Sequence, residues 1–301
     1  MKSNSKLKKR LIIFAFLLPS LAGLIVFSII PIIYSFLISF TDWNGLNRWN
    51  LNEGVPNLIG IQNYVEILKS EEFWKVLGNT FTFIILYIPL IIVMSILAAV
   101  LLNQKKRGVG IFRVVYFIPV LTSWVAASLI WKWLLSKDYG PVNQLLSFVG
   151  IDGPAWLQDP FWAMPGIVIA SVWKDLGYFS LILLGGLQGI NPTYYEAAQI
   201  DGANAFRKLM HITIPLLTPI LFFVMIISII SSFQLFPQVM IMTDAGPYGS
   251  TQVMVERIYR YSFNYHKMGY ASSFSWILFI IIFVFTLVQL RLQKKWVHYD
   301  G

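Results

Sequence analysis

The sequence has no cysteine among its 301 residues and only three histidines. Without cysteine there is no disulfide framework, no thiolate nucleophile and no cysteine-ligated zinc or iron–sulfur centre. The histidines, His211, His266 and His298, lie far apart in the sequence, which argues against a metal site built from histidine within this chain. We therefore expect neither a metal nor a cofactor in the chain itself.

Charged residues are also scarce. They make up 12% of the chain, whereas 57% of the residues are hydrophobic and the mean hydropathy is +0.67. A typical globular chain is roughly a quarter charged. This composition excludes an ordinary soluble enzyme, a nucleic-acid module and a disordered scaffold. What the chain has in abundance is apolar and aromatic sequence, as expected of a membrane protein.

Long runs without charge mark the expected membrane spans, because a helix needs roughly 20 apolar residues to cross a bilayer. The chain is predicted to be all-α, a single transmembrane domain over residues 1–301 with six spans. Their approximate bounds are 11–40, 76–103, 112–135, 161–187, 212–238 and 268–291. The first run is longer than a bilayer requires, so either Pro31 bends or ends the helix, or the helix projects beyond the membrane, and the sequence leaves these possibilities open.

The basic residues indicate the orientation of the spans. Lys and Arg cluster before the first span and at 105–113, 207–208 and 291–295, whereas most acidic residues fall in the other loops. Under the positive-inside rule, both termini are then cytoplasmic. The net charge of +9 is thus a topology signal, and nucleic acid is not an expected partner. The first apolar run is too long for a cleaved signal peptide, so we expect it to be retained.

One predicted cytoplasmic segment, residues 191–215, has a pattern of its own. Thr193 and Glu196 have capping-box spacing, which predicts the start of a short helix. Gly202 is expected to interrupt that helix, and Asp201 is placed to cap a second one. The pattern predicts a helix–turn–helix elbow between the fourth and fifth spans.

The elbow also offers features suited to a partner. The small side chains of Ala197 and Ala198 leave a flat surface that another protein can approach closely. The second helix would contain Phe206. Pro215 is expected to open the fifth spanning helix, where its missing N–H does no harm. The alternative interpretation is a plain surface loop between two spans.

The spacing E-A-A-x-x-x-G-x(9)-I-x-(aliphatic)-P resembles the signature loop of inner-membrane permease subunits of bacterial ATP-binding-cassette importers. One departure is an isoleucine before the final proline, where the family usually has leucine. Motifs along nearly the whole chain are similar to the carbohydrate-type branch, the maltose, multiple-sugar and glycerol-phosphate permeases. The residues that carry the loop pattern are Glu196, Ala197, Ala198, Gly202, Ile212, Ile214 and Pro215.

This resemblance implies a type I importer permease fold with a cytoplasmic coupling helix. It implies a multi-pass protein of the bacterial plasma (inner) membrane, surrounded by lipid, that forms half of a path for a sugar, expected to be an oligosaccharide. The implied partners are a second homologous permease subunit, two ATPase subunits docked at the coupling loop, and an external solute-binding protein. ATP and Mg would be bound by the ATPase, in agreement with the lack of a G-x-x-x-x-G-K-[ST] motif here, so this subunit would not itself be an enzyme. The residues assigned to ATPase coupling are Glu196, Ala197, Ala198, Asp201, Gly202, Phe206 and Pro215.

Lys174 and Asp175 lie midway through the fourth predicted span. Charges inside a span are costly and are functional candidates by default. Tyr178 shares their helix face, which offers hydrogen-bonding groups beside an aromatic plane, as a carbohydrate requires. The alternative is that the two charges only fix packing. The resemblance favours sugar contact, because sugar-contacting residues of the maltose-type permease fall at these three positions.

The fifth predicted span ends in a polar and aromatic cluster within otherwise aliphatic sequence. Pro237 frees a backbone carbonyl nearby, and irregular backbone inside a membrane lines cavities, so this stretch is predicted to line the substrate path. The alternative is hydrogen bonding between helices as packing glue. Trp124 and Trp131, in the third span, are interpreted as interfacial anchors or packing residues. The cluster comprises Ser231, Ser232, Phe233, Gln234 and Gln238.

A different class of function is an ion-coupled secondary transporter in which Lys174 and Asp175 form a proton or sodium relay. Against it, the sequence shows no paired broken helices in matching halves. A membrane-embedded enzyme has even less support, because no acid pair, histidine cluster or cysteine is present. The sequence does not specify which sugar is moved.

Overall fold

The computed structural model describes residues 2–46, 56–104 and 107–297. Within these ranges the chain is helical, and its only β contact is an isolated bridge between Thr41 and Leu58. The expectation of an all-α chain is confirmed. The helices form two compact units, of which unit 1 comprises Met1–Lys69 and Ile258–Ile277. Unit 2 comprises Ser70–Arg257 and Leu278–Gly301.

The first span, in unit 1, is a continuous helical run made of α1 (Lys2–Leu24), a π-helical turn (Ile25–Ile29) and α2 (Ile30–Ile38). The run continues through Pro31 because the turn before it is widened. The N–H of Ile30 bonds the carbonyl of Ile25, five residues back. A wider turn accommodates a residue that has no N–H and whose ring crowds the preceding turn.

Short polar contacts hold the end of α2 within unit 1. Asn63, on α3 (Gln62–Lys69), donates from its amide to the carbonyls of Ser39 and Thr41, at 2.9 Å each. Ser273, in the first half of α14 (Met268–Gln293), donates its hydroxyl to the carbonyl of Ser39 at 2.7 Å. The free carbonyls at the end of α2 are thus satisfied by side chains.

Unit 2 is built around α4 (Glu71–Leu102), α8 (Pro160–Gly189) and α11 (Ile214–Phe233). The N-terminus of α4 is capped by Ser70, whose hydroxyl accepts from the N–H of Phe73 at 3.2 Å. Apolar residues of the three helices form one buried core, among them Ile91, Ile167, Leu183, Leu217 and Val224. Because lipid tails are as apolar as these side chains, close packing rather than water exclusion holds such helices together.

The third predicted span, 112–135, is not a single straight helix. It consists of α5 (Val109–Leu121) and α6 (Trp124–Leu134), which are bent by 100° relative to each other. Thr122 between them is extended, and Ser123 starts the new helix by accepting from the N–H of Ala126 at 3.2 Å. The hydropathy of the run is uniform, so it conceals a break that the capping serine signals.

At Gly177 the helices α8 and α5 lie in close contact. A Cβ at this position would meet the carbonyl of Tyr116 and would lie 3.1 Å from a methyl group of Val120. A residue without a side chain is therefore required for these two helices to pack.

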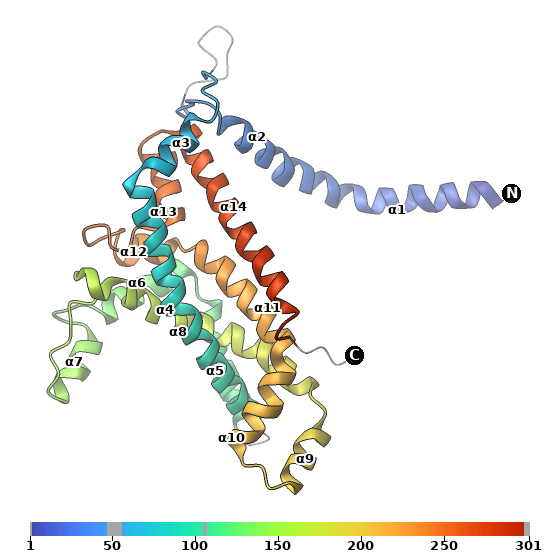
Figure 1. Ribbon diagram of the computed structural model, residues 1–301, viewed down its shortest axis with the longest axis vertical. Coiled ribbons are helices and arrows are strands. Elements are labelled where there is room, and N and C mark those ends of the chain that lie inside the picture. Colours follow the sequence, from blue (N-terminus) through green and yellow to red (C-terminus); the bar gives the residue numbers. More distant parts are fainter. Residues whose placement is uncertain (1, 47–55, 105–106, 298–301) are drawn as a thin grey trace. The chain divides into compact units, whose positions relative to one another are not determined.

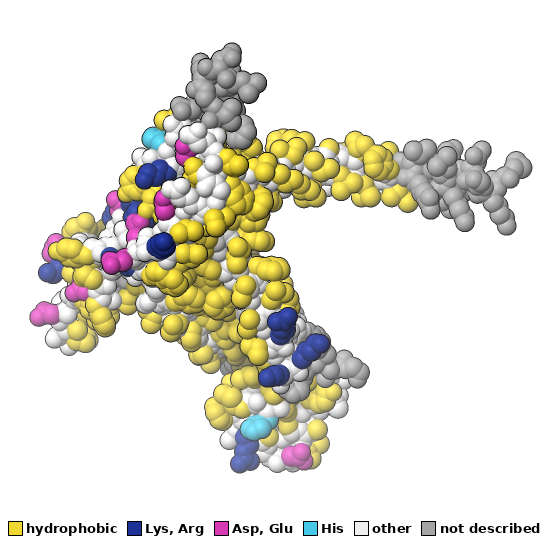
Figure 2. Space-filling view, turned by 45° about the horizontal axis from the view of Figure 1, so that its top comes forward, with side chains coloured by type: hydrophobic (Ala, Val, Ile, Leu, Met, Phe, Trp, Pro, Cys, Tyr) yellow, Lys and Arg dark blue, Asp and Glu magenta, His cyan; other side chains and the backbone are white. Residues whose placement is uncertain are grey.

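Within the described residues, five helices are long and apolar enough to cross a membrane, or six when the bent pair is counted as one span. The fifth of the predicted spans begins earlier than expected, since the helical run extends from Ala205 to Phe233. Figure 1 shows α9 (Pro192–Ile200) and α10 (Ala205–Lys208) at one end of unit 2. In Figure 2 the flanks of the spanning helices are covered by hydrophobic side chains, and the charged side chains gather near the helix ends.

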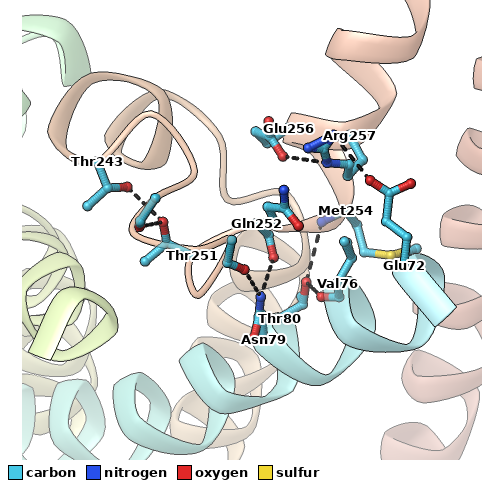
Figure 3. Close-up of polar contacts among 12 residues, drawn as sticks. Glu72, Val76, Asn79, Thr80, Thr243, Thr251, Gln252, Met254, Glu256 and Arg257 are labelled. Carbon is cyan, nitrogen blue, oxygen red and sulfur yellow. Dashed lines mark hydrogen bonds and ion pairs between the residues drawn. The ribbon is translucent and has the colours of Figure 1, made fainter. Parts of the chain in front are cut away.

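At the opposite end of unit 2 from α9, residues 243–257 are held against the first turns of α4; we name this segment the strap (Figure 3). Asn79 donates to the carbonyls of Gly249 and Gln252, at 2.9 and 3.0 Å. The N–H of Met254 donates to the hydroxyl of Thr80 at 3.4 Å. These contacts tie the strap to one face of α4.

The strap ends in a partly buried ionic cluster. Arg257 forms ion pairs with Glu72 and Glu256, each at 3.2 Å, and Glu256 is fully buried. The hydroxyls of Thr243 and Thr251 lie 2.8 Å apart and close the other end (Figure 3). Through α12 (Pro237–Met242), the strap continues directly into the residues that line the cavity described below.

Candidate functional site: an elbow and a polar cavity

The elbow begins with α9, whose N-terminus is capped by Asn191. The Asn191 side-chain oxygen accepts from the N–H of Thr193 at 3.0 Å and from its hydroxyl at 2.8 Å. The predicted capping box between Thr193 and Glu196 is therefore wrong, since an asparagine two residues earlier takes the role. Asparagine is among the strongest N-cap residues, and Pro192 favours the first helical turn. Glu196 is left exposed, and within the described residues its side chain forms no hydrogen bond or ion pair.

Gly202 ends α9, as predicted, and the geometry shows why. Its φ is +76°, in the left-handed region, and its N–H bonds the carbonyl of Gln199 at 3.1 Å. The N–H of Ala203 bonds the carbonyl of Ala198 at 2.8 Å. These two bonds define a Schellman motif, in which glycine takes the left-handed position at no steric cost.

Asp201 does not cap the second helix. It is the last residue of the α9 turn, and its N–H bonds the carbonyl of Ala197 at 3.0 Å. The cap of α10 is Asn204, whose side chain accepts from the N–H of Arg207 at 2.8 Å. The prediction for Asp201 is thus wrong, because the Schellman turn needs two further residues before the chain enters a new helix.

The elbow is joined to the fifth span without a break. After α10 a π-helical turn (Leu209–Thr213) leads into α11, and the N–H of Ile214 bonds the carbonyl of Leu209. Pro215 follows at once, so it lies in the first turn of α11 but within a longer helical run. Thr213 also lies 3.1 Å from the hydroxyl of Tyr195, which ties α9 to the base of α11.

The elbow exposes apolar side chains to its surroundings. Ile200 is 88% exposed and Phe206 is 65% exposed. Ala197 is exposed beside Glu196, and Ala198 is half-buried. A capped turn that presents apolar side chains and two exposed carboxylates, Glu196 and Asp201, has the features of a protein-docking surface.

Unit 2 also contains a cavity of about 340 Å³. Six of the residues predicted to line the substrate path border it, from α8 and from the end of α11 and start of α12. The break between α11 and α12, at Gln234 to Phe236, opens the backbone here. The six residues are Asp175, Tyr178, Ser231, Ser232, Gln234 and Gln238.

The remaining two predicted residues point elsewhere. Phe233 is buried and packs its ring against Phe81 and Phe285, with centroids 5.7 and 5.4 Å away. Lys174 is 6% exposed, and its ammonium donates to the carbonyls of Pro119 and Val120 at 3.3 and 3.2 Å. It therefore caps the C-terminus of α5 at the break, where a cation is favoured by the helix dipole.

Sequence reasoning missed several residues of the cavity wall. Tyr87 on α4 donates its hydroxyl to Asp175 at 2.7 Å and fixes that carboxylate. Trp124, interpreted from the sequence as an anchor or packing residue, borders the cavity, and the Lys174 ammonium lies 5.0 Å from its ring centroid. Tyr87 could have been found because it is a tyrosine in an otherwise aliphatic span. Trp124 could not, because it is positioned by the break between α5 and α6, which hydropathy does not show. Phe83, Ser171, Phe179, Ile227, Leu235 and Pro237 complete the wall.

Within the described residues, no group of three or more His, Asp or Glu side chains is placed to hold a metal ion. Apolar spanning helices around a polar, aromatic cavity, with an ordered docking elbow at one end, define a membrane transport component.

The chain belongs to the family described as binding-protein-dependent transport system inner membrane components, whose model matches residues 57–298. Three relatives illustrate the match. A probable ABC transporter permease protein, YesP of Bacillus subtilis, is 34% identical over 100% of this chain and 96% of its own length. The lactose transport system permease protein LacF of Rhizobium radiobacter is 35% identical over 93% of each chain. The trehalose/maltose transport system permease protein MalF of Thermococcus litoralis is 32% identical over 97% of each.

A solved structure agrees in fold. It is a chain of a bacterial ABC transporter involved in the import of the acidic polysaccharide alginate. Its TM-score is 0.84 at 23% sequence identity, with 98% of this chain and 99% of that chain covered. The expectations of a type I importer permease fold and of a permease subunit of an ATP-binding-cassette importer are confirmed.

Proposed function

We propose that this subunit forms half of a translocation path for oligosaccharides or related sugars and transmits the work of a separate ATPase to that path. The observation that carries the sugar assignment is the cavity wall. It sets a carboxylate and two amides, Asp175, Gln234 and Gln238, beside the aromatic rings of Trp124 and Tyr178. Sugars present hydroxyls at their edges and C–H groups on their faces, and this wall offers partners for both.

Two further observations support the sugar assignment. Relatives of this chain are named for lactose and for trehalose/maltose, and another, from Halalkalibacterium halodurans, for arabinooligosaccharides. The cavity volume lies at the lower end of the range for small-molecule sites, roughly 300–1,000 Å³. A cavity of this size holds a short stretch of a sugar chain, so a longer oligosaccharide would pass through it lengthwise.

We expect the combined variant Asp175→Ala, Tyr178→Ala and Gln234→Ala to lower sugar transport at least tenfold, because it removes hydrogen-bonding groups and an aromatic face from the wall. The measurement is uptake of labelled oligosaccharides by the complete importer in proteoliposomes. A matched control removes the same residue types outside this cavity, as Asp138→Ala, Tyr139→Ala and Gln144→Ala. Normal transport by the first variant in an assembled importer would show that the path runs elsewhere. Uptake driven by an ion gradient without ATP would favour a secondary transporter.

The proposed partners are a second homologous permease subunit, two ATPase subunits that bind ATP and Mg, and an external solute-binding protein. The ATPase would dock at the elbow through Glu196, Ala197, Ala198 and Phe206, with Gly202 setting the turn. A solved relative in fold, the alginate transporter, was crystallised in complex with a periplasmic protein bound to an alginate pentasaccharide. The proposed location is the bacterial inner membrane with both termini in the cytoplasm.

This orientation predicts which positions are accessible from outside the cell. Because the chain has no cysteine, single cysteines can be placed at Arg107, Asp152 and Lys294 without removing native ones. We expect a membrane-impermeant maleimide to label position 152 in intact cells, and positions 107 and 294 only after permeabilisation. The reverse pattern would invert the topology and place the elbow outside, away from any ATPase.

A further inference from the structure

A second concave site lies between the end of α4 and the start of α5, away from the sugar cavity. This groove has a volume of about 320 Å³. Most of its wall is apolar, and two polar side chains, Gln104 and Arg107, stand where the chain leaves α4. The other lining residues are Ala98, Leu101, Leu102, Val109, Phe112 and Tyr116.

The groove opens on the side of the helices that faces its surroundings. Leu101 and Phe112 are each 60% exposed, and Tyr116 is 38% exposed. In a chain that spans a membrane, these side chains meet acyl chains rather than water. The apolar wall is therefore suited to a hydrocarbon tail.

Positive charge surrounds the polar end of the groove. Arg107 is exposed there, and Arg113 donates from Nη2 to the carbonyl of Leu102, a lining residue, at 2.9 Å. The Nε of Arg113 is buried and has no hydrogen-bond partner. Within the described residues neither arginine forms an ion pair, so the groove has an uncompensated positive charge at one end. Lys105 and Lys106, which precede Arg107 in the sequence, lie outside the described residues.

We propose that this groove binds an anionic phospholipid, with the headgroup phosphate at Arg107 and the neighbouring Arg113 guanidinium and an acyl chain along Leu101, Phe112 and Tyr116. A planar guanidinium recognises phosphate through paired hydrogen bonds. Basic pockets between spanning helices are suited to anionic headgroups. A soluble anion would use the arginines but leave the apolar wall empty, and a soluble protein segment cannot reach a wall that faces acyl chains.

A lipid bound in this groove would affect how α4 and α5 are held together. The groove is formed by both helices that flank the link 103–108, and α5 packs against α8 at Gly177. A bound lipid would bridge α4 and α5 where the chain between them is short. Figure 1 shows α4 ending at the same end of unit 2 as the elbow, which places the lipid in the cytoplasmic leaflet under the proposed orientation.

The test uses the whole importer complex, purified and placed in nanodiscs of phosphatidylglycerol and phosphatidylcholine with matched acyl chains. Native mass spectrometry then measures which lipid is retained. We expect phosphatidylglycerol to be retained selectively, and Arg107→Gln to weaken its retention about fivefold, the factor that corresponds to about 1 kcal/mol per basic residue near an anionic surface. Arg291→Gln is the matched control, because it removes the same charge from an exposed position at the end of α14, away from the groove.

Three outcomes would overturn the proposal. The first is equal retention of both lipids by the unaltered complex. The second is an equal loss in Arg107→Gln and Arg291→Gln, which would indicate general surface charge only. The third is displacement of the lipid by millimolar inorganic phosphate, which would indicate a site for a free anion. The readout is lipid retention and not transport, so its failure is distinct from a failure of the proposed sugar path.

Discussion

Replacing Gly202 with valine is expected to abolish the stimulation of ATP hydrolysis by the loaded solute-binding protein. The φ of +76° at this position is strongly unfavourable for a β-branched residue. Left-handed backbone costs an ordinary residue roughly 1–2 kcal/mol, so the Schellman turn would open and α9 would lose its fixed direction. Transport requires this direction, because the elbow must pass the movement of the ATPase to α11 without bending.

The matched control for this substitution is Gly150→Val. Gly150 has the same φ of +76° and, like Gly202, has open space where a Cβ would be placed. It lies just beyond α7 (Pro141–Phe148), far from the elbow in the sequence, so it reproduces the backbone strain without affecting the elbow. ATP hydrolysis in proteoliposomes, with and without loaded binding protein, and co-purification of the ATPase are the measurements. Normal stimulation in Gly202→Val would reduce the elbow to a plain loop.

Lys174→Met is expected to destabilise the assembled importer, whereas Lys174→Arg is expected to preserve most of its stability. The ammonium of Lys174 donates to two carbonyls at the end of α5 and lies over the ring of Trp124. Its removal leaves the part-buried carbonyl of Val120 without this donor, whereas the carbonyl of Pro119 still accepts from the hydroxyl of Thr122. An unsatisfied buried carbonyl costs about 1–3 kcal/mol. The loss would also release Trp124 from its place in the cavity wall, so transport should fall as well.

Thermal unfolding of the complex in detergent, measured together with sugar uptake, distinguishes a helix-capping role of Lys174 from direct contact with the sugar. If Lys174 is a cap, its loss lowers both the midpoint of unfolding and the rate of uptake. Asp175→Asn serves as the comparison, since an amide can still accept from Tyr87 and keeps the shape of the wall. If Lys174→Met unfolds at the normal temperature and only the uptake is lost, Lys174 contacts the sugar and the capping role is secondary.

Hydropathy located the spans but not their interruptions. The run 112–135 is mostly apolar, with charges only at Arg113 and Lys132, yet Thr122 and Ser123 divide it because a serine hydroxyl satisfies a new helix start there. Hydropathy counts side chains, whereas a break depends on where backbone N–H and carbonyl groups find partners. The fifth span was likewise placed too late, since the π-helical turn allows the helix to continue ahead of Pro215.

The candidate site was foreseen in part for a similar reason. Helical spacing put Asp175 and Tyr178 on one face, and both border the cavity. The same spacing put Lys174 with them, but a long side chain follows its hydrogen-bond partners rather than its Cβ. Those partners, on α5, are more than fifty residues away in sequence. Contacts of this range leave no local pattern that identifies the partner: a tyrosine in an aliphatic span marks Tyr87 as unusual, but nothing near it in sequence indicates Asp175.

Two of the three π-helical turns in the described part of the chain share one sequence feature: each ends immediately before an isoleucine–proline pair, at Ile30-Pro31 and at Ile214-Pro215. The third, Arg260–Asn264, has no proline after it. A π turn is equivalent to one residue inserted into an α-helix. Each helical residue advances the chain by about 100° around the axis, so one inserted residue rotates the rest of the helix by that angle. At Leu209–Thr213 the extra residue therefore determines the direction in which the elbow faces around the axis of α11. Deletion of one residue from this turn would leave the capping and surface residues of the elbow unchanged. It would, however, rotate the proposed docking face of the elbow by about 100° around the helix axis, away from the partner.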